Sequence, residues 1–172
     1  MDRTNNSRSK LTLVLALFLI FCILVISGCQ EEDNLFREKK RSMISEAKSA
    51  VGSVTVDELA EMMNNDDEFT IIDIRTKDEF TPGHLKGSVW IARGMLEFKA
   101  GQGQLKDFDK KYILYCRVDS RSALAAKTLV DMGYRDVSLL KGGFSAWCEA
   151  GYSIYNRHGE MVVKSFEQDE TE

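Results

Sequence analysis

The pattern of hydrophobic and polar positions changes character along the chain. It begins with an apolar run from Leu11 to Ile26 that only Thr12 interrupts, and a stretch of mixed charge follows. Further on, apolar residues come in short runs separated by polar turns. Three of these runs have the length and β-branched content of strands that are buried on both faces. They cover residues 69–74, 112–115 and 137–140.

Helical spacing marks two further segments. Thr55 followed by Glu58 fits a capping box, and the apolar positions after it recur at helical intervals. A second helix is predicted from Ser120 to Met132, with Gly133 as its stop. Because this helix lies between two predicted strands, the order implies parallel pairing through a right-handed crossover. The pattern predicts an α/β fold with helices on both faces of the sheet.

The N-terminus has the layout of a secretory signal. Arg3, Arg8 and Lys10 precede the apolar run Leu11–Ile26, as in the basic and apolar regions of a signal peptide. A helix of this length reaches about 24 Å, which is short of the roughly 30 Å hydrocarbon core of a bilayer. We therefore favour a signal peptide over a permanent transmembrane helix.

The next residues resemble the lipobox of bacterial lipoproteins. Ile26-Ser27-Gly28 places one aliphatic and two small residues before Cys29, which in that class is lipidated, with acyl chains such as palmitate, and becomes the mature N-terminus. The alternative is an uncleaved signal anchor with an incidental cysteine, and both place the domain at a membrane and outside the cytoplasm. The predicted organisation is a signal peptide over residues 1–28, a charged tether over 29–50, a folded domain over 51–156 and an acidic tail over 157–172.

Charge and cysteine usage narrow the functional classes. Residues 1–28 hold three of the 23 basic and one of the 27 acidic residues, so the remainder has 20 and 26 and a formal net charge of −6. Such a surface does not attract nucleic acid. Only Cys116 and Cys148 fall in the folded part, which argues against a disulfide scaffold. With two histidines, His84 and His158, and no cysteine cluster, we expect no metal site.

Cys116 ends one predicted strand and lies five residues before Arg121, so the loop between them joins a buried strand to the first turn of a helix. Ligands of open α/β sheets bind at this carboxyl edge. The loop N–H groups and the helix dipole can hold an anion there, and they favour the nucleophilic thiolate. The alternative is an inert buried cysteine, but the nearby basic residues Arg117 and Arg121 favour a functional thiol.

Four blocks of residues, in order and over roughly residues 51–154, resemble the single-domain rhodaneses. The blocks are Asp73-Ile74-Arg75; Glu79-Phe80 with Gly83-His84-Leu85-Lys86-Gly87-Ser88; the Cys116 loop; and Gly142-Gly143-Phe144-Ser145-Ala146-Trp147 with Ala150-Gly151-Tyr152. The resemblance implies a five-stranded parallel sheet flanked by helices. It also implies a sulfurtransferase, without a cofactor, that moves a sulfane sulfur from a donor to a thiol or cyanide-like acceptor through a cysteine persulfide.

The resemblance also implies roles for individual residues. Cys116 becomes the persulfide-forming thiol, while Asp73 and Arg75 brace the loop as an ion pair. His84 matches a structural hydrogen-bonding position, although it is also the one base in the domain available to a Cys–His arrangement. Four residues separate Cys116 from Arg121, and phosphatase relatives need one more, so we predict against phosphatase activity. The substrate-binding loop comprises Arg117, Val118, Asp119, Ser120 and Arg121.

Two departures from the family pattern leave alternatives open. Asp119 stands where many family loops have glycine; its carboxylate could cap the helix near Ser120, pair with an arginine, or oppose an anionic donor such as thiosulfate. Arg93 could receive an anionic substrate or lie solvated. Two hypotheses remain besides a sulfurtransferase. One is a module that binds a persulfide, senses it or docks on a partner without turnover, and the other is a thiol–disulfide partner that uses Cys148. The donor, the acceptor and any protein partner are not specified by the sequence.

Overall fold

Residues 32–65 and 67–162 are described by a computed structural model of the chain. The chain divides into two units, Met1–Ser42 and Met43–Glu172. A helix covers residues 32–49, and residues 43–49 of it belong to the second unit. The predicted signal peptide, its lipidation site Cys29 and the end of the acidic tail lie outside the described residues. Within the described ranges, no helix is long and apolar enough to cross a membrane.

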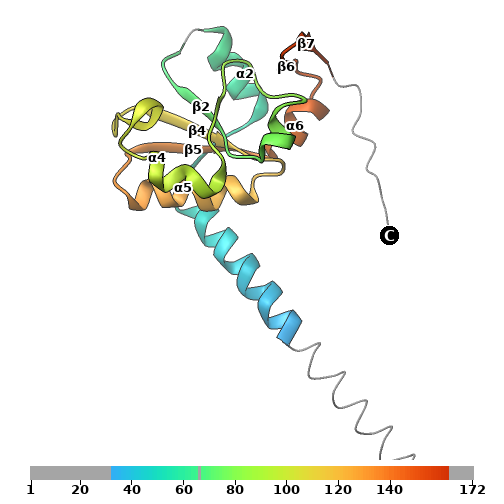
Figure 1. Cartoon of the computed structure of the whole chain (residues 1–172). Coiled ribbons are helices and arrows are strands. Elements are labelled where there is room, and N and C mark those ends of the chain that lie inside the picture. Colours follow the sequence, from blue (N-terminus) through green and yellow to red (C-terminus); the bar gives the residue numbers. More distant parts are fainter. Residues whose placement is uncertain (1–31, 66, 163–172) are drawn as a thin grey trace, which may run out of the picture. The chain divides into compact units, whose positions relative to one another are not determined.

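The second unit is built on a five-stranded sheet in the order β1-β5-β4-β2-β3, and every neighbouring pair is parallel (Figure 1). This confirms the predicted α/β architecture. The strands are β1 (Gly52–Val54), β2 (Thr70–Asp73), β3 (Val89–Trp90), β4 (Lys111–Tyr115) and β5 (Asp136–Leu140). The helices are α2 (Val56–Asn64), α3 (Lys77–Phe80), α4 (Leu96–Lys99), α5 (Ser120–Asp131) and α6 (Gly143–Glu149), with 3-10 turns at Arg93–Met95 and Gly103–Leu105.

Side chains of the central strand β4 alternate between two cores. Tyr112 and Leu114 pack with apolar residues of α4 and α5, whereas Ile113 and Tyr115 pack with apolar residues of α2 and α6. Successive residues of a strand point to opposite faces of the sheet. Helices therefore cover both faces, and this explains why the strand reads as a continuous apolar run.

Most predicted elements are present with shifts of one or two residues. The capping box at the start of α2 is confirmed, because Thr55 Oγ1 accepts from the Glu58 N–H and the Glu58 carboxylate accepts from the Thr55 N–H. A hairpin of β6 (Ile154–Asn156) and β7 (Gly159–Met161) extends beyond residue 157, where the acidic tail was predicted to begin. Its turn is closed by the His158 N–H, which donates to Asn156 Oδ1 at 2.8 Å.

The end of the helix over residues 32–49 packs on the sheet unit. Ala47 is fully buried in a small core with Ala123 of α5 and Leu139 of β5. Glu46 lies close enough to Lys127 of α5 to help raise the pKa of that lysine, although Asp131 is the larger cause. Residues of the predicted charged tether therefore touch α5, the helix that follows the Cys116 loop.

Candidate active site around Cys116

Cys116 follows the last residue of β4, the strand at the centre of the sheet, and it is 1% exposed. The next two residues, Arg117 and Val118, are exposed, and α5 starts at Ser120. Ser122, in the first turn of α5, places its Oγ 3.7 Å from Cys116 Sγ and 2.8 Å from the Asp119 carbonyl oxygen. Its single hydroxyl proton can be donated to either acceptor, so it can turn to a sulfur anion when one forms.

The carbonyl side of the loop is held by the start of α6. The Phe144 N–H donates to the Cys116 carbonyl at 2.8 Å, and the Ser145 N–H donates to the Arg117 carbonyl at 3.0 Å. In a trans peptide the C=O and the following N–H point in opposite directions. Because α6 takes both carbonyls, the N–H groups of Arg117 and Val118 face away from it.

The amide side of the loop remains open to a ligand. Across residues 32–65 and 67–162, no atom accepts a hydrogen bond from the main-chain N–H groups of residues 117–121. Unpaired donors at the first turn of a helix, next to the positive end of its dipole, form a site for an anion. The geometry around Cys116 therefore provides a thiol and five N–H donors in one loop.

The pair Gly142-Gly143 explains how α6 approaches so closely. Both glycines have positive φ, +69° and +59°. A Cβ on Gly143 would lie 2.5 Å from the Cys116 carbonyl oxygen and 2.9 Å from that of Arg117. The sequence pattern contained these glycines as part of a family motif, but it did not reveal that they admit the loop backbone.

Asp119 is the one described non-glycine residue with a positive φ, +83°. Among the described residues its carboxylate makes no side-chain cap on α5 and pairs with no arginine, which argues against two of the three roles that the sequence left open. Instead, Lys48 Nζ lies 2.6 Å from Asp119 Oδ1, and the Gly142 N–H donates to Oδ2 at 3.4 Å. The two carboxylate oxygens therefore have different partners: Oδ1 pairs with the Lys48 ammonium, and Oδ2 accepts from the Gly142 N–H.

The two arginines of the loop differ in their partners. Arg121 donates from both terminal nitrogens to the carboxylate of Glu79, at 2.8 and 2.6 Å. This pair lowers the pKa of Glu79 to about 2 and raises the pKa of Arg121, to which Cys116 adds a smaller contribution. Arg117, by contrast, is exposed, and its side chain contacts no partner among the described residues. Sequence reasoning had placed Glu79 in a motif without assigning it this partner.

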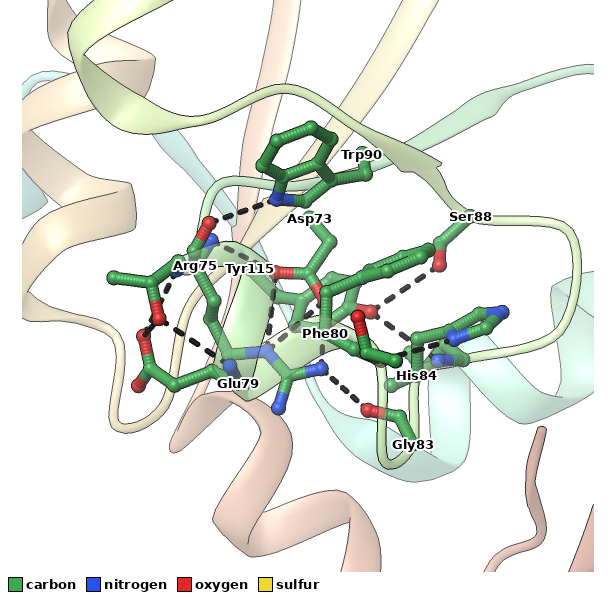
Figure 2. A network of polar contacts seen from close by, with 12 residues as sticks. Asp73, Arg75, Glu79, Phe80, Gly83, His84, Ser88, Trp90 and Tyr115 are labelled. Atoms are coloured by element: carbon green, nitrogen blue, oxygen red, sulfur yellow. Dashed lines mark hydrogen bonds and ion pairs between the residues drawn. The ribbon is translucent and has the colours of Figure 1, made fainter. Parts of the chain in front are cut away.

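Asp73 and Arg75, at the end of β2, form a buried ion pair (Figure 2). Their side chains are 0% and 3% exposed and lie 2.7 Å apart. Arg75 also donates to the Gly83 carbonyl at 2.7 Å, and its guanidinium lies 3.8 Å from the centroid of the Phe144 ring. The pair therefore links the end of β2 to the loop at Gly83 and to α6, whose N-terminus holds the Cys116 loop.

Tyr115, the residue before Cys116, is anchored on the opposite face of the sheet. Its hydroxyl accepts from the Leu85 N–H at 3.2 Å and lies 3.2 Å from Ser88 Oγ (Figure 2). Burial raises the pKa of this phenol above its ordinary value. This anchor fixes the end of β4 and, with it, the direction in which Cys116 points.

The remaining candidate residues are engaged elsewhere. His84 stacks on the Phe80 ring with centroids 4.0 Å apart, and its Nδ1 lies 3.2 Å from the Phe80 carbonyl. Arg93 pairs with Glu97 at 2.7 Å rather than lying free. These contacts favour a structural role for His84, and they argue against a role for Arg93 in binding the substrate.

Cys148 is not placed to act with Cys116. Both thiols are free, and they belong to cores on opposite faces of the sheet. Burial raises the pKa of Cys148 to about 11, which keeps it as the unreactive thiol. Among the described residues there is also no cluster of histidine, cysteine and carboxylate side chains that could hold a metal ion.

Two surface pockets, of about 380 and 350 Å³, lie away from Cys116. The first is bordered by residues such as Ser53 and Met62, and the second by Trp147 and Tyr152. Neither includes a residue of the loop.

A family model and curated relatives both match this chain, and the family model covers the Cys116 loop. The model of the rhodanese-like domain family matches residues 55–150. A thiosulfate sulfurtransferase GlpE from Pseudoalteromonas translucida is 34% identical over 105 residues, covering 58% of this chain and 90% of the relative. A thiosulfate sulfurtransferase GlpE from Shewanella oneidensis is 38% identical over 80 residues, covering 46% and 76% of the two chains.

Among solved structures, a protein of unknown function from Rhodopseudomonas palustris, described as a possible tyrosine phosphatase, superimposes with a TM-score of 0.61. It is 36% identical in sequence, and the alignment covers 66% of this chain and 91% of the other.

Proposed function

Because the chain belongs to the rhodanese-like family, we propose that it is a sulfurtransferase that carries a sulfane sulfur as a persulfide on Cys116. The observation that supports this most is the pairing of a strand-end thiol with the five open N–H donors of residues 117–121. A terminal persulfide sulfur is a small anion, and preorganised main-chain donors stabilise such an anion as an oxyanion hole does.

The reaction has two displacements. The Cys116 thiolate attacks the outer sulfur of a donor such as thiosulfate, the S–S bond of the donor breaks, and sulfite leaves with the bonding pair. The product is the anion Cys116-S-S⁻. A thiolate or cyanide then attacks the outer sulfur, the S–S bond to Cys116 breaks, and the Cys116 thiolate is regenerated. No cofactor or external oxidant is needed.

The test uses the full chain in non-ionic detergent with thiosulfate and cyanide. We expect thiocyanate to form, Cys116→Ser to abolish it, and Cys148→Ser to retain it, because Cys148 lies in the other core. Thiocyanate formation that survives Cys116→Ser would falsify the assignment. Hydrolysis of p-nitrophenyl phosphate, measured in parallel, should be absent, since four residues rather than five separate Cys116 from Arg121.

A persulfide-holding module without efficient turnover is the second candidate. Asp119 is the reason to consider it, because a loop carboxylate that is not neutralised by a lysine opposes a dianionic donor. Intact mass spectrometry separates the two: one added sulfur that persists with cyanide present supports the holding module, whereas its rapid loss supports the transferase.

We also propose that the domain is anchored as a lipoprotein on the outer side of a membrane, through a lipid on Cys29. The support is the apolar run Leu11–Ile26 followed by Ile26-Ser27-Gly28-Cys29. Metabolic labelling with palmitate should mark the wild-type chain but not Cys29→Ala. Retention of label in that variant would contradict the anchor.

A further inference from the structure

We infer that Lys48, from the helix that precedes the domain, is a specificity-determining residue of the Cys116 site: it neutralises Asp119 and so lets the loop accept anionic sulfur donors. This rests on the proposed function. The observation behind it is the contact of 2.6 Å between Lys48 Nζ and Asp119 Oδ1, which joins residues 71 positions apart in the chain.

Lys48 is held in place by its neighbours. Ala47 is fully buried against Ala123 and Leu139, and Ser49 Oγ donates to the Glu46 carbonyl at 2.8 Å, which ties the last turn of the helix together. The lysine is therefore presented by a packed helix end rather than by a mobile terminus. Its side chain is 41% exposed, but the carboxylate that it meets is only 16% exposed.

Asp119 sits where its charge matters for a donor. Its main-chain N–H is one of the donors of the loop without an acceptor among the described residues, and its carboxylate accepts from the Gly142 N–H rather than capping α5. With Arg121 taken by Glu79, an unpaired Asp119 would cancel the charge of Arg117. Paired with Lys48, it leaves the loop with the positive charge of Arg117.

The size of the effect follows from Coulomb's law. When Lys48 is removed, Asp119 carries one uncompensated negative charge. Over roughly 7 Å between this carboxylate and the donor, in a water-like medium, that charge weakens the binding of a monoanion about threefold and of a dianion about sevenfold. A charge effect therefore depends on the donor, so that the change for thiosulfate is about the square of the change for a monoanionic thiosulfonate. A purely structural brace would affect both donors equally.

The experiment compares the KM and kcat of the full chain in non-ionic detergent, at constant ionic strength, for thiosulfate and benzenethiosulfonate. Lys48→Met should raise KM about sevenfold for the first donor and about threefold for the second, with kcat little changed. Lys48→Arg should restore both values. The double variant Lys48→Met/Asp119→Asn should return KM to within about twofold of wild type, since asparagine also tolerates a positive φ.

Lys39→Met is the matched control, because Lys39 is an exposed lysine of the same helix and its loss changes net charge equally. Equal KM values for Lys39→Met and Lys48→Met would overturn the inference. The inference would also be overturned if Lys48→Met lowered kcat equally with both donors and adding Asp119→Asn did not reverse this loss. If turnover is slow, the rate at which Cys116 gains one sulfur, followed by intact mass, gives the same comparison. If Cys116 gains no sulfur in the wild-type chain, the proposed function itself fails, and this inference fails with it.

Discussion

The contact between Gly143 and the loop carbonyls makes Gly143→Ala the sharpest test of how the site is held. An added Cβ would meet the carbonyl oxygens of Cys116 and Arg117 at 2.5 and 2.9 Å, closer than real Cβ atoms approach. Both obstacles are main-chain atoms, which cannot rotate aside as a side chain can. Either the loop or α6 must therefore move, and the N–H bonds from Phe144 and Ser145 are lost.

Two contributions determine how much Gly143→Ala lowers the free energy of unfolding. Alanine in a left-handed conformation costs about 1–2 kcal/mol, and two lost hydrogen bonds cost about 1 kcal/mol each. Gly143→Ala should therefore lower the free energy of unfolding by about 3–4 kcal/mol, which most domains with a total of roughly 5–15 kcal/mol survive. Because the loop N–H groups are reoriented, sulfur loading of Cys116 in the folded protein should slow about 100-fold, the scale of losing oxyanion-hole donors.

The measurement is urea unfolding followed by the fluorescence of Trp90 and Trp147, combined with the loading rate of Cys116 by intact mass. Gly151→Ala is the matched control: its φ is +78°, yet an added Cβ would meet nothing within 4 Å. It should cost only about 1–2 kcal/mol, the penalty of a left-handed alanine, and leave loading unchanged. If Gly143→Ala matches this control in both measurements, the close approach of α6 does not hold the loop.

Three further predictions concern the groups around the loop. Glu79 has a folded pKa of about 2 against an ordinary 4.5, so its pairing with Arg121 stabilises the fold above pH 4.5, and this contribution is lost as the pH falls toward 2. Glu79→Gln should cost about 1–2 kcal/mol at pH 7, and its urea midpoint should fall less steeply than that of wild type between pH 5 and 3. Arg75→Met leaves Asp73 buried without its partner and should cost about 3–5 kcal/mol. Thermal unfolding measures that loss, and recovery on adding Asp73→Asn is expected, whereas no recovery would contradict the ion-pair explanation. Cys148, with a pKa of about 11 and 4% exposure, should resist iodoacetamide at pH 8 until the protein is unfolded, as peptide mass mapping can determine; a Cys116–Cys148 disulfide peptide would refute this.

The sequence predicted the elements whose local pattern is sufficient. β2, β4 and β5 are buried on both faces, so each reads as an apolar run, and Thr55 and Glu58 mark the start of α2 within four residues. β1 and β3 are edge strands of three and two residues. Runs so short carry no periodicity, and a five-stranded sheet was expected only because of the family resemblance.

The site was predicted unevenly for a similar reason. Cys116 and its loop follow from the order strand, cysteine, helix, which is local in sequence. The partners of the loop are not local, because Glu79 lies 42 positions from Arg121 and Lys48 lies 71 from Asp119. Lys48 was also obscured by its surroundings, since it ends a highly charged stretch in which no single lysine stands out.

The partners that sequence could not supply change the electrostatic description of the site. From the sequence alone the loop holds two arginines and one aspartate. In the structure, Glu79 takes Arg121 and Lys48 takes Asp119, so Arg117 is left as the charged loop side chain without a partner among the described residues. Arg117 is exposed, so its attraction for an anion is screened by solvent. An anion held over Cys116 must then depend chiefly on the main-chain N–H groups of residues 117–121. The N–H groups of Arg117 and Val118 keep their direction because α6 holds the carbonyls of Cys116 and Arg117 on the other side of the same two peptides. Binding strength at this loop is thus a property of backbone geometry, and the paired side chains determine which anions it accepts.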